Sequence, residues 1–203
     1  MKKSLFVTFL AVTLVGIVTP RANAYRILYA EQWYQLFHEH FYQYPDDTME
    51  NIWYLEQALK SDFANPLYAL TKINNNLQWA RYRYLFYMHV NLLLIQQYRL
   101  LASKYDKRVA YFYNYPWKQE NLDSLKTAEE LYTVALEFWP EALKWSAKAA
   151  TLPLVQLNGV QYWEDESYQI QTGQLNYAEI IQMDLNHLDY VRNTFEKMNS
   201  STY

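Results

Sequence analysis

The chain has 203 residues, no cysteine and a formal net charge of −3 at pH 7. The lack of cysteine excludes disulfide bonds and thiolate metal sites, and the acidic balance argues against a nucleic-acid partner, because binding of phosphate backbones requires clustered positive charge. Only three glycines occur, too few for the turns that β-hairpins normally use. The composition therefore predicts an all-α protein.

Residues 1–24 have the pattern of a secretory signal peptide. Two lysines are followed by an apolar run over 5–18 and by small residues that predict a cut after Ala24. Because this run is shorter than the ~20 residues that a membrane-spanning helix needs, we expect cleavage and release into an exported compartment, most simply a bacterial periplasm. An uncleaved membrane anchor is the alternative. Cleavage would leave 15 Lys and Arg against 21 Asp and Glu.

The remaining residues, 25–203, are predicted to form a single all-helical, repeat-like domain. Apolar residues at helical spacing predict a first helix over 25–44, which Pro45 ends. Asp46 and Asp47 follow, and their negative charge suits the unpaired N–H groups at the start of a second helix.

A long helical pattern extends over 67–103, with residues 65–66 (Asn-Pro) as its cap and first turn. The three asparagines at 74–76 are a point where it can be interrupted. The stretch 85–95 is the most apolar of the chain after the signal segment. Because this stretch has only 11 residues, we expect a buried core helix and no membrane span.

The second half of the chain begins with an aromatic-rich segment, 111–117. It breaks the helical rhythm and is predicted to be irregular and packed down by its aromatic rings, with a partner-binding patch as the alternative. Helices are expected over 121–138 and 140–150, and a loop-rich region over 153–173. A final helix is expected after Asn176, which begins a capping-box pattern.

The helix after residue 121 contains a pattern typical of tetratricopeptide repeats. Ala128, Tyr132, Ala135 and Pro140 fill the small, aromatic, small and proline positions of the second helix of such a repeat. Around Ala58 the same pattern is only partial. We therefore predict antiparallel helical hairpins in a degenerate tetratricopeptide-like array, with an ordinary all-helical domain as the alternative.

Residues suited to catalysis or metal binding are few. His38 and His40 are two positions apart and point to different sides of a helix, so they cannot chelate one ion from that helix. His89 is predicted to be a hydrogen-bonded core histidine, and His187 to lie on a helix surface. We expect no catalytic site, no metal site and no cofactor, and hence no enzyme.

An acidic stretch follows Trp163, formed by Glu164, Asp165 and Glu166. Paired carboxylates beside aromatic rings can hydrolyse glycosides, but adjacent residues do not flank a substrate. A solvated acidic loop or docking patch is therefore expected.

The block 162–170, followed by 175–177 and the final helix, resembles the C-terminal part of exported spirochaete proteins that carry tetratricopeptide-like repeats, including components of the periplasmic flagellar collar. Together with the signal peptide and the segment 128–140, the resemblance spans most of the chain. It implies a structural role around the flagellar motor, in which the protein holds other proteins without catalysis.

The predicted function is an exported helical scaffold or adaptor that binds protein partners in the cell envelope through an aromatic-rich face. The alternative is a periplasmic solute- or carbohydrate-binding protein with an aromatic-lined groove. No membrane span beyond the signal segment is expected, and the oligomeric state is left open. The residues predicted for the partner-binding face and its acidic rim are Trp79, Tyr82, Tyr111, Tyr113, Tyr115, Trp117, Trp163, Glu164, Asp165 and Glu166.

Overall fold

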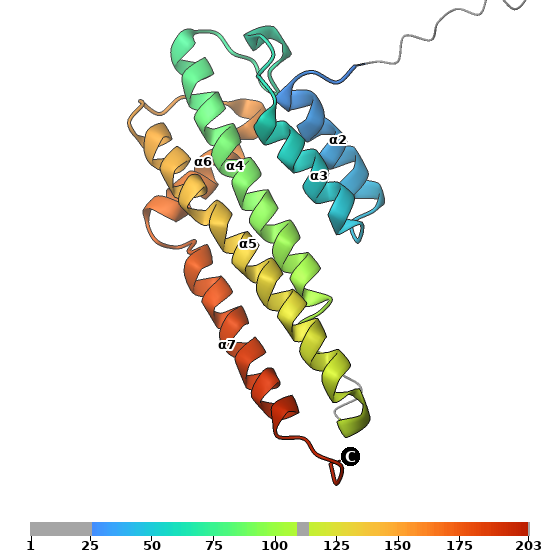
Figure 1. Ribbon diagram of the computed structural model, residues 1–203. Helices are drawn as coiled ribbons and strands as arrows, with labels where there is room; N and C mark the ends of the chain where they lie inside the picture. The colour runs from blue at the N-terminus through green and yellow to red at the C-terminus, as the bar shows by residue number, and fades with distance from the viewer. Residues whose placement is uncertain (1–25, 109–113, 203) are drawn as a thin grey trace, which may run out of the picture.

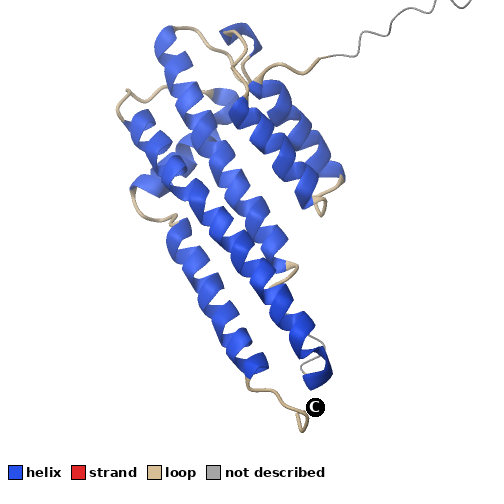
Figure 2. Cartoon of the chain, in the orientation of Figure 1, coloured by secondary structure: helices blue, strands red, loops and turns tan. Residues whose placement is uncertain are grey.

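The computed structural model describes residues 26–108 and 114–202, so the predicted signal peptide lies outside the described residues. All regular elements in this part of the chain are helices, and no strand occurs among them (Figure 2), which confirms the all-α prediction. The α-helices are α2 (Ala30–Gln43), α3 (Thr48–Lys60), α4 (Asn76–Ser103), α5 (Lys118–Ala150), α6 (Gln161–Gln171) and α7 (Tyr177–Glu196). Three short 3₁₀ helices are η1 (Pro66–Tyr68), η2 (Tyr115–Trp117) and η3 (Asn158–Val160).

Five of the helices form an antiparallel array. Figure 1 shows α2, α3, α4, α5 and α7 running in alternating directions, and each contacts the next in this order. The short helix α6 contacts both α4 and α5. The two long helices therefore form the centre of the molecule, and the α2–α3 hairpin and α7 lie on either side of them.

Local signals predicted several helix ends correctly. α2 ends at Gln43, just before Pro45, and the side chain of Asp47 accepts a hydrogen bond from the backbone N–H of Glu50 at the start of α3. The side chain of Asn176 likewise accepts from backbone N–H groups in the first turn of α7. These side chains satisfy donors that have no partner within the helix.

The start of the long central helix was predicted too early. Residues 65–66 begin only the 3₁₀ turn η1, and α4 starts at Asn76, where the side chain of Asn75 accepts from the backbone N–H of Gln78. Leu67 in η1 is 89% exposed. A helix in a protein is stabilised mainly by burying one of its faces. Because Leu67 is not buried, packing does not favour an extension of α4 back to this residue.

The predicted helix break at Pro140 is wrong. α5 continues through this residue for 33 residues in total, because Pro140 lies on an exposed face while Trp139, Ala142 and Ser146 stay buried on the other. α4 has 28 residues, so each long helix approaches the length of a whole 34-residue repeat that should hold two helices. A tetratricopeptide-like arrangement is therefore not confirmed.

The core lies along α4. Between residues 85 and 95, Leu85, Phe86, Met88, Leu94 and Ile95 are fully buried, which confirms the prediction of a core helix.

Within the described ranges, none of the helices combines the length and the apolar character needed to cross a membrane.

A buried carboxyl group fixes the start of α2. Glu31 is 2% exposed, and its Oε2 accepts a hydrogen bond of 3.0 Å from the backbone N–H of Ala64. The N–H of Ala30 donates to the carbonyl of Asp62 at 2.9 Å, so the chain after α3 is held against the beginning of α2. Burial raises the pKa of Glu31 above its ordinary value, although the bond from Ala64 opposes this shift.

Replacing Glu31 by glutamine is therefore expected to stabilise the fold at pH 7 and to change little at pH 4. The folded protein binds the carboxyl proton more tightly than the unfolded chain, so the contribution of Glu31 to stability is present below its unfolded pKa, about 4.5, and is lost as the pH rises through the higher folded value. Glutamine keeps an acceptor for Ala64 and carries no charge. Urea unfolding at both pH values measures the change in the free energy of unfolding for Glu31→Gln and for the exposed control Glu39→Gln. Equal effects of Glu31→Gln at pH 4 and pH 7 would contradict a raised pKa of Glu31.

Candidate functional site

The aromatic residues predicted for a partner-binding face do not form one exposed surface. Tyr82 is completely buried, and its hydroxyl accepts a hydrogen bond from the backbone N–H of Leu70. Trp79 is half-buried and stacks on Tyr82 with the ring centroids 5.4 Å apart. The placement of Tyr82 on a binding surface is therefore wrong, because it belongs to the core. Tyr111 and Tyr113 lie outside the described residues.

Tyr115 and Trp117 are on the surface, in η2, with exposed fractions of 44% and 51%. η2 directly precedes α5, whereas Trp79 lies in the first turn of α4. Because α4 and α5 are antiparallel, these two starts lie at opposite ends of the helix pair (Figure 1). The structure thus groups Trp79 and Tyr82 with Trp163, whose ring centroid lies 5.7 Å from that of Tyr82. It places Tyr115 and Trp117 apart from this group.

The predicted acidic loop is also wrong, because residues 161–171 form the helix α6. Trp163 is fully buried, and Glu164 makes a buried ion pair with Arg81, in which Nε and Nη2 each lie 2.5 Å from a carboxylate oxygen. The third guanidinium nitrogen, Nη1, donates to the carbonyls of Ala149 and Leu152. Glu164 and Arg81 therefore join α6, α4 and the end of α5. Of the three carboxylates predicted for the acidic rim, Asp165 alone is fully on the surface.

A second polar chain connects α6 to the core. His89 Nδ1 lies 2.6 Å from a carboxylate oxygen of Glu166, and His89 Nε2 lies 2.9 Å from the hydroxyl of Tyr34, which is itself 2.9 Å from the hydroxyl of Tyr162. Burial, followed by the hydrogen bond with Tyr162, raises the pKa of Tyr34. An activated nucleophile needs a lowered pKa, which is the opposite shift. These hydrogen-bonded side chains instead join α2, α4 and α6. His89 is the hydrogen-bonded core histidine that the sequence predicted.

An open groove with aromatic walls lies between α3, α4 and α5. Its volume is about 450 Å³, which is within the usual range for binding sites in proteins. We call it the α3–α5 groove; it is lined by Leu59, Tyr87, Asn91, Glu137, Phe138, Glu141 and Trp145.

The centre of the groove is rigid. Tyr87 and Trp145 stack with their ring centroids 4.6 Å apart and their planes at 28°. The ammonium group of Lys148 lies 4.1 Å from the centroid of Trp145. Trp145 therefore already has an aromatic partner and a cationic partner. Such cation–π and stacking contacts fix the ring in place.

Two carboxylates, Glu137 and Glu141, lie on the α5 side of the groove. Phe138 stacks on Tyr98 at 5.6 Å, and the Tyr98 hydroxyl donates to a carboxylate oxygen of Glu56 at 3.1 Å. Burial together with Glu56 raises the pKa of Tyr98 to about 12. Glu141 pairs with a lysine of its own helix, whereas Glu137 forms no ion pair within the described residues. The groove therefore presents apolar rings between the carboxylate of Glu137 and the ammonium group of Lys148, which lies against Trp145.

None of the groove residues was among those predicted from the sequence. The signal was present on α5, where Phe138, Glu141 and Trp145 follow one another at spacings of three and four and so share one helix face. What the sequence lacked was the position of α3, since Leu59 closes the groove from a helix about 80 residues earlier.

The profile of a family described as a domain of unknown function, DUF8513, matches residues 77–198, which is more than half of the chain. The chain belongs to the DUF8513 family. The DUF8513 region covers α5, α6, α7 and nearly all of α4, and the α2–α3 hairpin precedes it. No curated protein and no solved structure matched the chain. Two walls of the groove thus lie within the DUF8513 region, and the third, from α3, lies before it.

Proposed function

We propose that this protein is an exported helical scaffold that binds a partner protein, and that the α3–α5 groove receives a basic amphipathic helix of that partner. The observation that carries the proposal is the combination of half-buried aromatic walls with the unpaired carboxylate of Glu137. The proposed site replaces the face that the sequence suggested.

The dimensions of the groove support a helical ligand. Its α5 wall extends from Glu137 to Trp145, which corresponds to about 12 Å at 1.5 Å per residue. This length accommodates two turns of a helix whose apolar side chains recur at i, i+3 or i+4, and i+7. Lysine or arginine beside these side chains would face Glu137, and the net negative charge of the chain would favour the approach of such a segment.

The rival function, carbohydrate binding, receives less support from the same groove. A sugar ring would stack on a free aromatic face, but Trp145, the largest ring in the groove, already contacts the ring of Tyr87 and the ammonium group of Lys148. The groove is better suited to side chains that insert between its walls.

The exported location follows from the signal-peptide pattern and remains part of the proposal. The sequence resemblance makes envelope proteins near the flagellar motor the first partners to examine. A partner recovered by affinity capture supports the proposal only if its binding depends on the groove.

The test is therefore a comparison of groove variants against the captured partner. Phe138→Ala should raise Kd by at least about 30-fold, since buried aromatic anchors typically contribute 2 kcal/mol or more. Glu137→Lys should slow association and weaken its dependence on salt. Surface plasmon resonance measures both effects, and circular dichroism verifies the fold.

Matched controls lie on α6, which contributes no residue to the groove. Asp165→Lys makes the same charge reversal at an exposed position, and Tyr168→Ala removes an aromatic ring that is 62% exposed. Neither should change Kd. Loss of binding in the α6 variants with normal binding in the groove variants would move the site to the acidic segment that the sequence suggested.

A further inference from the structure

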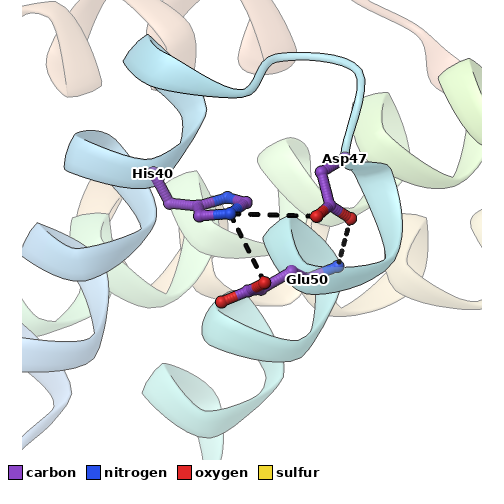
Figure 3. A group of neighbouring side chains, drawn as sticks. All are labelled: His40, Asp47 and Glu50. Carbon is purple, nitrogen blue, oxygen red and sulfur yellow. Dashed lines mark hydrogen bonds and ion pairs between the residues drawn. The ribbon is translucent and has the colours of Figure 1, made fainter.

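Three side chains converge at the turn between α2 and α3. His40 comes from the last turn of α2, Asp47 is the N-cap of α3, and Glu50 lies in its first turn. Figure 3 shows the imidazole pointing toward both carboxylates, with His40 Nε2 3.4 Å from Glu50 Oε2 and 3.9 Å from Asp47 Oδ2. The three ligand atoms all lie within 4.8 Å of one another.

The neighbouring side chains fix the tautomer of His40. Asn51 is completely buried, and its Nδ2 donates to the carbonyl of Tyr44, so its Oδ1 is the atom that lies 2.9 Å from His40 Nδ1. An amide oxygen only accepts hydrogen bonds, and Nδ1 must therefore carry a hydrogen. In the neutral ring, Nε2 then directs a lone pair at two carboxylates. A cation between them, or a proton on Nε2, makes this arrangement favourable.

The carboxylates are also held in position. The Tyr54 hydroxyl donates to Glu50 Oε1 at 2.5 Å, and this bond is the main reason that the pKa of Tyr54 is raised to about 12. Asp47 Oδ1 accepts from the N–H of Glu50. Each carboxylate thus keeps one oxygen for its neighbour and turns the other toward His40. Such supporting bonds to metal-binding side chains are typical of protein metal sites.

We propose that His40, Asp47 and Glu50 bind one divalent transition-metal ion, with Zn²⁺ as the best fit. One imidazole nitrogen and two carboxylate oxygens match the ligand preference of zinc, and two ligands at 2.0–2.1 Å in a tetrahedral site are about 3.4 Å apart. The separation of His40 Nε2 from Glu50 Oε2 has this value, and the 3.9 Å to Asp47 Oδ2 is somewhat longer, so Asp47 would move closer to bind the ion. Two negative charges balance the ion, and the exposed side of the cluster leaves its fourth position to water.

The ion would connect the end of α2 to the start of α3. His40 and Glu50 are ten residues apart, so one ion closes the whole turn, and α3 carries the Leu59 wall of the α3–α5 groove. The site is independent of the groove, because the two share no residue.

The test is calorimetric titration of the full chain, purified without a polyhistidine tag, with ZnCl₂. We expect one ion per chain and a rise in Tm of about 5–10 °C at zinc concentrations 100 times Kd. His40→Gln and Glu50→Gln should each weaken zinc binding by more than about 100-fold, and Tyr54→Phe by about 10-fold. Asp47→Asn should also weaken zinc binding. Because asparagine is an equally good N-cap for α3, the fold should stay intact, and the loss of affinity would report on Asp47 as a ligand.

The control is His38→Gln, which removes an exposed imidazole two residues away on the same helix. It should bind zinc like the unmodified chain, and circular dichroism should be the same for all variants. Absence of stoichiometric zinc binding in the unmodified chain would overturn the proposal. Binding that survives His40→Gln, or that MgCl₂ reproduces, would also overturn it.

Discussion

Replacing Arg81 by methionine is expected to lower the free energy of unfolding by about 3–5 kcal/mol. The guanidinium is 3% exposed and the carboxylate of Glu164 is 7% exposed, so the substitution leaves a buried charge without its partner. It also removes the donor to the carbonyls of Ala149 and Leu152 at the end of α5. Urea unfolding monitored by circular dichroism measures the loss.

A double-mutant cycle separates the pair from the rest of its surroundings. Arg81→Met combined with Glu164→Leu should be less destabilised than the sum of the single variants, with a coupling of at least about 2 kcal/mol. The control Lys60→Met breaks an ion pair in which Lys60 is 64% exposed, and it should change stability by less than about 1 kcal/mol. Additive effects at Arg81 and Glu164 would show that the two side chains do not interact.

Trp163→Ala is expected to destabilise the protein by about 3–5 kcal/mol, the usual range for removal of a buried aromatic side chain. Trp163 is fully buried and stacks on His89, with their ring centroids 5.2 Å apart. It also contacts the rings of Tyr34 and Phe86. The substitution therefore opens a cavity where α2, α4 and α6 meet.

The same helix provides the control for this prediction. Tyr168→Ala removes a ring that is 62% exposed and should change stability by less than about 0.5 kcal/mol. Thermal unfolding of both variants distinguishes a core position from a docking position. A normal Tm for Trp163→Ala would contradict its placement in the core and support the partner-binding role that the sequence suggested.

The parts of the fold that sequence reasoning predicted depend on local chemistry. Asp47 and Asn176 cap their helices because the groups that they satisfy lie two or three residues away. The apolar face of α7, with Ile181, Leu188 and Val191 buried, follows from spacing within one helix. Such features do not require knowledge of how the helices pack.

The errors have the opposite origin. Glu164 was assigned to an acidic loop because its partner, Arg81, is 83 residues away in the sequence. Pro140 was taken as a helix start, but packing of the opposite face of α5 overrides the local preference of proline. The cluster proposed to bind zinc was not visible in the sequence for the same reason: His40 was compared only with His38 on its own helix, whereas its neighbours come from the start of α3.

The groove required the most non-local information. Its walls come from three helices, whereas the sequence was read one segment at a time. Two of the residues that it singled out, Tyr82 and Trp163, are buried in the core. Phe138 and Trp145 are less conspicuous in the sequence, but they share one face of α5 next to α3.

The central claim is that the α3–α5 groove is the partner-binding surface, and site-specific photocrosslinking in the native cell envelope tests it most directly. The crosslinker p-benzoylphenylalanine would replace Phe138 in the groove or, as a control, Tyr190, which is 72% exposed on α7. We predict a defined adduct from position 138, attached to a basic amphipathic helix of one envelope protein, and none from position 190. Adducts from position 190 with none from position 138 would contradict the account.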